Sequence, residues 1–166
     1  MNISDPDFHL PSEIFVHQDC TGSISDIVSR YGSRVILVTT SHDFEIFHDI
    51  IDNLTASLRR SGIGCMIYDQ IPRNPNTEDI DLAVSFSKKT NCDLILGFGG
   101  PESIHSARAI SLLTSNYLFC HDLFKNQELQ KPPVPFITIP AYPVYGFELM
   151  PMLILEEIHE HTRKTY

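Results

Sequence analysis

The segment of this 166-residue chain with the clearest chemical potential is GFGGPESIH, residues 97–105, which follows an apolar run and opens a helical pattern. A glycine-rich turn at the start of a helix leaves backbone N–H groups unpaired, and these groups can bind phosphate at the positive end of the helix dipole. A dinucleotide pyrophosphate is a ligand that such a turn commonly holds. The same pattern also forms tight turns without a ligand, because glycine adopts backbone conformations that other residues avoid. The motif alone leaves both interpretations open.

Two residues of this turn oppose the binding of phosphate. Pro101 removes a backbone donor from the anion site. Glu102 places a carboxylate at the same helix terminus, where it stabilises the helix by about 0.3 to 1 kcal/mol. In a partly desolvated cleft, the repulsion between this carboxylate and a phosphate is several-fold larger. We therefore expect weakened dinucleotide binding.

Four short apolar runs predict the buried strands that position this turn. They are too short for helices and are rich in β-branched residues. The runs cover residues 35–40, 65–68, 93–98 and 134–139. Residues 126–133, NQELQKPP, are predicted to form a surface loop.

Amphipathic helical patterns lie between these runs. Ser41 and Thr77 are the predicted N-caps of two helices, since their side-chain oxygens can accept a backbone N–H. Gly62 is predicted to end the first of them in the left-handed conformation. Pro101 stands in a first helical turn, where its missing N–H has no helical partner to lose.

Helical crossovers between buried strands make the strands parallel, because each crossover returns the chain to the same edge of the sheet. The sequence therefore predicts an α/β fold, a Rossmann-like three-layer sandwich with a mainly parallel sheet, in a single domain over residues 1–166. Three polar segments follow strands and should meet at the carboxyl edge, where ligands bind in such sheets. They are residues 39–43, 97–105 and 140–148.

The composition restricts the partners and the location. Asp and Glu outnumber Lys and Arg by 21 to 12, for a formal charge of -9, so nucleic acid is not an expected partner. The N-terminus has no basic, apolar leader, and no stretch approaches a membrane span, so we expect a cytoplasmic protein without membrane contact. The cysteines are dispersed without a CxxC pair, which favours free thiols: Cys20, Cys65, Cys92 and Cys120.

The order of these signatures resembles the iron-containing alcohol dehydrogenase family, which is similar to glycerol dehydrogenase and dehydroquinate synthase. The family's PNP-type link resembles IPRNPN, residues 71–76. Its GGGSxxDxAK turn and helix resemble GGPESIHSAR, residues 99–108, and its IPTTxGTGSE segment resembles IPAYPVYGFE, residues 139–148. The resemblance covers residues 8 to about 150 and implies a dinucleotide-binding N-terminal half.

Only part of the family's phosphate turn is kept. Gly99 and Gly100 match its first two glycines, but the third glycine, the serine, the aspartate and the lysine are replaced by Pro101, Glu102, His105 and Arg108. In the later loop Gly146 matches, while Tyr142, Tyr145 and Phe147 replace small residues near the family's nucleotide. These aromatic side chains either fill the cofactor space or pack against a neighbouring domain or subunit. The implied cofactor-binding residues are Thr40, Gly99, Gly100, Glu102, His105, Tyr142 and Gly146.

The first strand bears on the choice of cofactor. Many family members carry an acidic residue there that binds the adenine ribose, and Thr40 stands in its place. Thr40 cannot repel a 2′-phosphate, so NADP is no worse placed than NAD if a dinucleotide binds. The altered glycine turn implies that the binding of either cofactor is weakened. Asp43 is interpreted as a first-turn stabiliser of its own helix.

No catalytic or metal-binding residue is predicted. The family's iron ligands lie in a C-terminal helical domain that has no counterpart here, so the resemblance implies no iron on this chain. His159 and His161 form a pair that we expect to be solvated, because a metal site needs more ligands. Cys120, His121 and Asp122 are sequence neighbours, which is not the spatial arrangement of a catalytic triad.

Three functions remain open. The first is a non-catalytic binding or regulatory module, a pseudoenzyme whose turn accepts at most a small nucleotide ligand. The second is the NAD(P)-binding half of a split or truncated metal-dependent oxidoreductase, completed by a helical partner domain; the charged end of the chain after Met150 slightly favours an independent chain. The third is oligomerisation, as a homodimer, or partner docking through residues 8–17, whose family counterpart pairs as a strand across a dimer interface.

Overall fold

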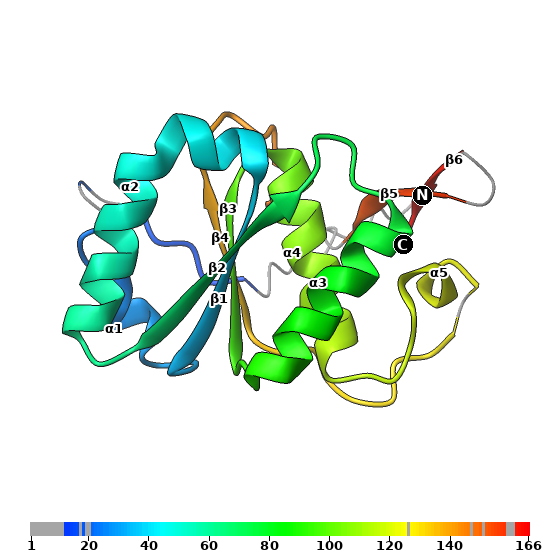
Figure 1. Cartoon of the computed structure of the whole chain (residues 1–166), viewed down its shortest axis with the longest axis horizontal. Coiled ribbons are helices and arrows are strands. Elements are labelled where there is room, and N and C mark those ends of the chain that lie inside the picture. The colour runs from blue at the N-terminus through cyan, green and yellow to red at the C-terminus, as the bar shows by residue number, and fades with distance from the viewer. Residues whose placement is uncertain are drawn as a thin grey trace, which may run out of the picture.

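The computed structural model describes residues 12–16, 18, 21–125, 127–146, 148–150, 152–158 and 162–166. Helices and strands alternate along most of this length (Figure 1). In chain order they are α1 (Ile24–Val28), β1 (Arg34–Thr40), α2 (Ser41–Arg60), β2 (Gly64–Ile71), α3 (Thr77–Thr90), β3 (Leu94–Gly99), α4 (Pro101–Thr114), α5 (Cys120–Leu123), β4 (Phe136–Pro140), β5 (Ile154–Glu157) and β6 (Thr162–Thr165).

Four parallel strands form the central sheet, in the order β2-β1-β3-β4. Helices α1 and α2 cover one face of the sheet, and α3 and α4 cover the other (Figure 1). The predicted Rossmann-like α/β sandwich is therefore confirmed. The connection after β1 leads to β2 at one edge of the sheet, whereas the connection after β3 leads to β4 at the opposite edge. A topological switch point therefore lies between β1 and β3. In open parallel sheets this is where a ligand crevice forms.

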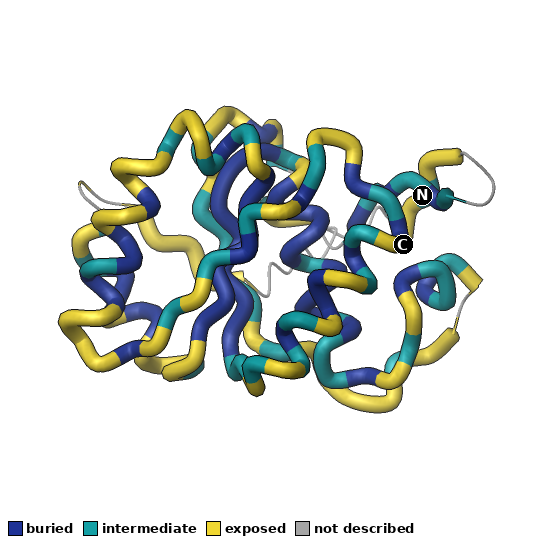
Figure 2. The backbone as a smooth tube through the Cα atoms, viewed as in Figure 1, coloured by how far each residue is buried: buried dark blue, intermediate teal, exposed yellow. Residues whose placement is uncertain are grey.

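Alternate residues of each central strand enter opposite hydrophobic cores. Val35 and Leu37 of β1 pack with the inner side of α2, whereas Ile36 and Val38 pack with α3 and α4. Figure 2 shows the buried residues concentrated in the strands and on the helix sides that face them. This two-sided burial explains why the inner strands β1 and β3 are largely apolar, whereas the edge strand β2 also contains Asp69 and Gln70.

Both predicted N-caps are wrong by one residue. Thr40, and not Ser41, caps α2, because its side chain accepts the N–H of Asp43 at 3.0 Å. Asn76, and not Thr77, caps α3, and it forms a capping box with Asp79. Each helix therefore begins one residue earlier than predicted. The prediction that Gly62 ends α2 in the left-handed conformation is confirmed, since Gly62 has a φ of 75°.

The chain ends in a β-hairpin that the sequence patterns did not predict. Strands β5 and β6 pair antiparallel, with Ile154 opposite Thr165. The N–H of Glu156 donates to the carbonyl of Pro75 at 3.3 Å, which ties the hairpin to the link between β2 and α3. The hairpin therefore stands beside the carboxyl edge of the sheet. His159 and His161 lie outside the described residues.

None of the helices described by the structure combines the length and the apolar character needed to cross a membrane.

Candidate functional site

A buried carboxylate closes the switch point. The Oδ2 atom of Asp43, in the first turn of α2, accepts a hydrogen bond from the Gly100 N–H at 3.0 Å and from the Ser103 hydroxyl at 2.7 Å. Ser103 in turn accepts the N–H of Thr40 at 3.0 Å. Asp43 is only 4% exposed and Ser103 is fully buried. The Asp43 side chain therefore occupies the N-terminus of α4, where an anion site is one of the two interpretations that the sequence leaves open.

The close approach of this carboxylate requires a glycine in the turn. Gly99 has a φ of 130°, a conformation that residues with side chains rarely adopt. A Cβ atom at Gly99 would lie 2.1 Å from Oδ2 of Asp43 and 2.7 Å from Oγ of Ser103. The close packing of Asp43 and Ser103 therefore explains why residue 99 is a glycine.

An aromatic ring covers the outer side of the same turn. A Cβ atom at Gly100 would lie 3.4 Å from Cδ2 of Tyr142. The Tyr142 ring also packs edge-on against Phe47, with 5.3 Å between the ring centroids. Burial raises the pKa of Tyr142, and the nearby Asp43 carboxylate adds to this rise. Tyr142, which is 37% exposed, and the buried Asp43 therefore lie next to each other at the glycine turn.

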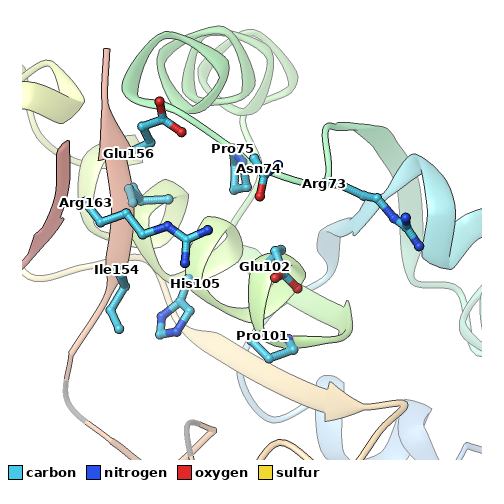
Figure 3. Close-up of a pocket in the computed structure, with 10 residues that line it drawn as sticks. Arg73, Asn74, Pro75, Pro101, Glu102, His105, Ile154, Glu156 and Arg163 are labelled. Carbon is cyan, nitrogen blue, oxygen red and sulfur yellow. The ribbon is translucent and has the colours of Figure 1, made fainter. Parts of the chain in front are cut away.

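A cavity of about 160 Å³ remains beside this cluster (Figure 3). It lies between the link that follows β2, the first turns of α4 and the terminal hairpin. Arg163 and His105 both line this cavity, whereas in Figure 3 Arg73 points away, in agreement with its 2.8 Å hydrogen bond to His42. The cavity is lined by Arg73, Asn74, Pro75, Pro101, Glu102, His105, Ile154, Leu155, Glu156 and Arg163.

His105 and Arg108, which replace the family's aspartate and lysine, are both packed within the protein. Burial, together with the smaller effect of the Arg108 charge, lowers the pKa of His105 to about 4, so the imidazole is neutral at pH 7. The Arg108 guanidinium donates to the carbonyl oxygens of Met152 and Glu148 and lies over the ring of Phe136. Arg108 therefore holds the segment that leads to the hairpin.

The predicted site residues gather at this edge, with one exception. Thr40, Gly99 and Gly100 lie at the closed turn under Tyr142, while Glu102 and His105 line the adjoining cavity. Gly146 has a φ of 91°, but a Cβ atom there would meet nothing within 4 Å, so no described contact joins it to the turn. Phe147 lies outside the described residues.

The role of Asp43 is not evident from the sequence. Its place in the first turn of α2 predicts a stabiliser of that helix, whereas the carboxylate pairs with the terminus of α4. Glu102 was expected to satisfy the α4 terminus, but the side chain bonded there is that of Asp43. The sequence signal for this role is that Asp43 lies three positions after the end of β1, a strand that borders the switch point.

Other candidate reactive groups show no catalytic arrangement. Cys120 is fully buried, and burial raises the pKa of its thiol. Asp122 accepts the N–H of Phe119 at 3.0 Å, and its other oxygen lies 3.1 Å from His121. Within the described ranges, no three His, Cys, Asp or Glu side chains are grouped to hold a metal ion.

The parallel sheet and the glycine turn at its switch point define a domain of the dinucleotide-binding type. Residues 11–166 match the model of the iron-containing alcohol dehydrogenases, and the chain belongs to that family. The match continues past residue 150 and includes the terminal hairpin.

Several relatives have alcohol dehydrogenase names. The chain is 24% identical over 156 residues to alcohol dehydrogenase 4 of Schizosaccharomyces pombe, covering 94% of this chain and 37% of that protein. It is 28% identical over 134 residues to long-chain-alcohol dehydrogenase 1 of Geobacillus thermodenitrificans, covering 77% and 33%. The crystal structure of an iron-containing alcohol dehydrogenase from Thermotoga maritima matches with a TM-score of 0.85 and 24% identity, covering 96% and 44%. The chain thus spans less than half the length of these relatives.

Proposed function

We propose that this chain is a non-catalytic binding or regulatory module, derived from the dinucleotide-binding part of an alcohol dehydrogenase and closed at its phosphate turn. The observation that carries this proposal is the pairing of the Gly100 N–H with Asp43. A pyrophosphate at a helix terminus needs unpaired N–H groups. Here this donor is already bonded, and Pro101 has no N–H to offer.

Electrostatics support the same proposal. Asp43 and Glu102 place two carboxylates near the terminus of α4, in a chain whose formal charge is -9. At an effective dielectric constant of about 20, two unit charges 4 Å apart repel by about 4 kcal/mol. A repulsion of that order weakens the binding of a phosphate group by about three orders of magnitude.

The small volume of the cavity beside the turn also supports the proposal of a closed module. The cavity beside the turn has a volume of about 160 Å³, whereas pockets for drug-sized ligands span roughly 300 to 1,000 Å³. Tyr142 covers the turn itself. A dinucleotide therefore requires this ring and the terminal hairpin to move, while a smaller ligand does not.

A second candidate is the NAD(P)-binding half of a split or truncated metal-dependent alcohol dehydrogenase. The partial coverage of the relatives favours it, since the chain spans 37% of one dehydrogenase and 33% of another. Relatives named NAD-dependent methanol dehydrogenase and NADH-dependent butanol dehydrogenase A favour a nicotinamide cofactor. In this proposal a helical partner domain supplies the metal ligands.

Titration of the chain with NADH and with NADPH separates the two candidates. The chain contains no Trp, so the emission of the reduced nicotinamide can be followed without Trp fluorescence from the protein. We expect no saturable binding of either cofactor below millimolar concentration. Binding of either cofactor in the low-micromolar range would refute the closed module and support the enzyme half.

A further inference from the structure

We propose that Asp43 is an internal anion that takes the place of phosphate on the α4 terminus, and that removing its carboxylate reopens the turn to phosphate-bearing ligands. This inference deepens the proposed function and rests on its claim that the unmodified turn is closed. It assigns the closure to one side chain that lies outside the glycine motif.

The topology brings this side chain to the turn. Strands β1 and β3 are neighbours in the sheet, so the first turn of α2, which follows β1, lies beside the start of α4, which follows β3. Asp43 therefore crosses the switch point to reach Gly100, which is 57 positions away in the sequence.

The donors around Asp43 are those that a phosphate oxygen would use. Its Oδ2 atom accepts from a backbone N–H at the helix terminus and from the hydroxyl of Ser103, at 3.0 and 2.7 Å. The phenol of Tyr142 lies near the same carboxylate, which raises the pKa of that phenol in addition to the effect of burial. Such bonds from neutral donors to an ionised oxygen are stronger than bonds between two neutral groups.

The carboxylate is held without a cation. Asp43 is 4% exposed, and the described residues form no ion pair between Asp43 and a Lys or Arg side chain. Its charge is therefore balanced by hydrogen bonds and by the helix terminus. Truncation to Ala leaves a small space lined by the Gly100 N–H and the Ser103 hydroxyl, whose donors are then unpaired. A buried donor without an acceptor destabilises the fold, and an external anion can restore the acceptor.

The test is anion rescue of Asp43→Ala. Thermal melts are compared in inorganic phosphate and in sodium chloride of matched ionic strength. We expect the variant to melt below the wild type and to regain stability in millimolar phosphate, while the wild type does not respond specifically to phosphate. Asp49→Ala removes an exposed acid from the same helix and should behave like the wild type. An equal phosphate response in wild type and Asp43→Ala would overturn the inference.

Asp43→Asn provides a second variant that keeps the side-chain shape and one acceptor oxygen while losing the charge. If Asp43→Ala does not fold, this variant is titrated with phosphate and NADH instead. We expect at least tenfold tighter binding of one of these ligands than in the wild type. Adding Ser103→Ala to the same variant should remove that gain. A folded Asp43→Asn protein with no gain for either ligand would overturn the inference.

The outcomes separate this inference from the proposed function. Low-micromolar NADH binding by the wild type contradicts the closed module, whatever the variants do. A wild type that does not bind, together with variants that do not bind, contradicts the role of Asp43 alone. A wild type that does not bind, together with variants that gain phosphate or NADH binding, supports both.

Discussion

A Cβ atom at Gly97 would lie 2.8 Å from the Cβ of Ala107, so strand β3 and helix α4 meet at these two residues without room for a side chain between them. This contact fixes the height of α4 above the sheet. It therefore also fixes the position of the turn that precedes α4.

We predict that Gly97→Ala destabilises the protein by about 1 to 3 kcal/mol, the usual cost of overpacking a well-packed core. The free energy of unfolding in urea measures the change. Gly64→Ala is the control, because the nearest atom to a Cβ there is the Ser33 carbonyl oxygen at 3.6 Å, an ordinary contact. Equal stabilities of the two variants would contradict a close contact at Gly97.

We predict that Ser103→Ala destabilises the protein by about 1 to 3 kcal/mol, because it leaves the buried N–H of Thr40 without its acceptor. Equilibrium denaturation measures this change as well. Ser85→Ala is the matched control on an exposed part of α3, where the hydroxyl bonds to the carbonyl of Asp81. A loss at Ser103 no larger than that at Ser85 would argue against the bridge between β1 and α4.

We predict that His105 makes stability fall in acid. Burial lowers its pKa to about 4 in the folded protein, below the ordinary value of 6.5. The unfolded chain therefore binds the proton first as the pH falls from about 6.5 to 4, which removes about 1 to 3 kcal/mol of stability over this window.

Urea denaturation of wild type and His105→Gln between pH 7.5 and 4.5 measures this contribution. The variant should lose less stability than the wild type below pH 6.5. His48→Gln, which changes an exposed histidine on α2, should follow the wild-type curve. Parallel curves for wild type and His105→Gln would show that His105 does not titrate differently on folding.

We predict that the segment before α1 supports homodimerisation. The side chains of Ile14 and Val16 are 56% and 87% exposed, although both are apolar. Light scattering at high concentration should give twice the 18.8 kDa mass of one chain. Val16→Asp should give a monomer, while Tyr117→Ser, which alters an exposed aromatic residue after α4, should not. A wild-type monomer at high concentration would contradict this prediction.

The inner strands β1 and β3 were the most predictable elements, because burial on both sides makes them largely apolar whatever their neighbours are. The caps were predicted one residue late, since Thr40 and Ser41, like Asn76 and Thr77, are adjacent residues of the types that cap helices. Strand β6 was missed, because a four-residue strand with the sequence TRKT has no apolar alternation to reveal it.

The position of the site was predictable, but its closure was not. The carboxyl edge of a parallel sheet follows from the order of strands and helices, and Gly99 and Gly100 mark the turn. The bond from Gly100 to Asp43 depends on which strands are neighbours, and local patterns do not contain that information. Only a tertiary structure could place the two residues together.

The position of Asp43 has a consequence for any attempt to restore a cofactor turn. Grafting the family's residues onto positions 99–108 would supply the missing glycine, serine and lysine, yet the carboxylate would still approach from another segment. We therefore expect the two regions to be epistatic, so that changes in the motif restore phosphate binding only when position 43 is also changed. Gly99 is kept by a neighbour in the fold, so its presence in an alignment does not measure how much cofactor affinity the chain has inherited.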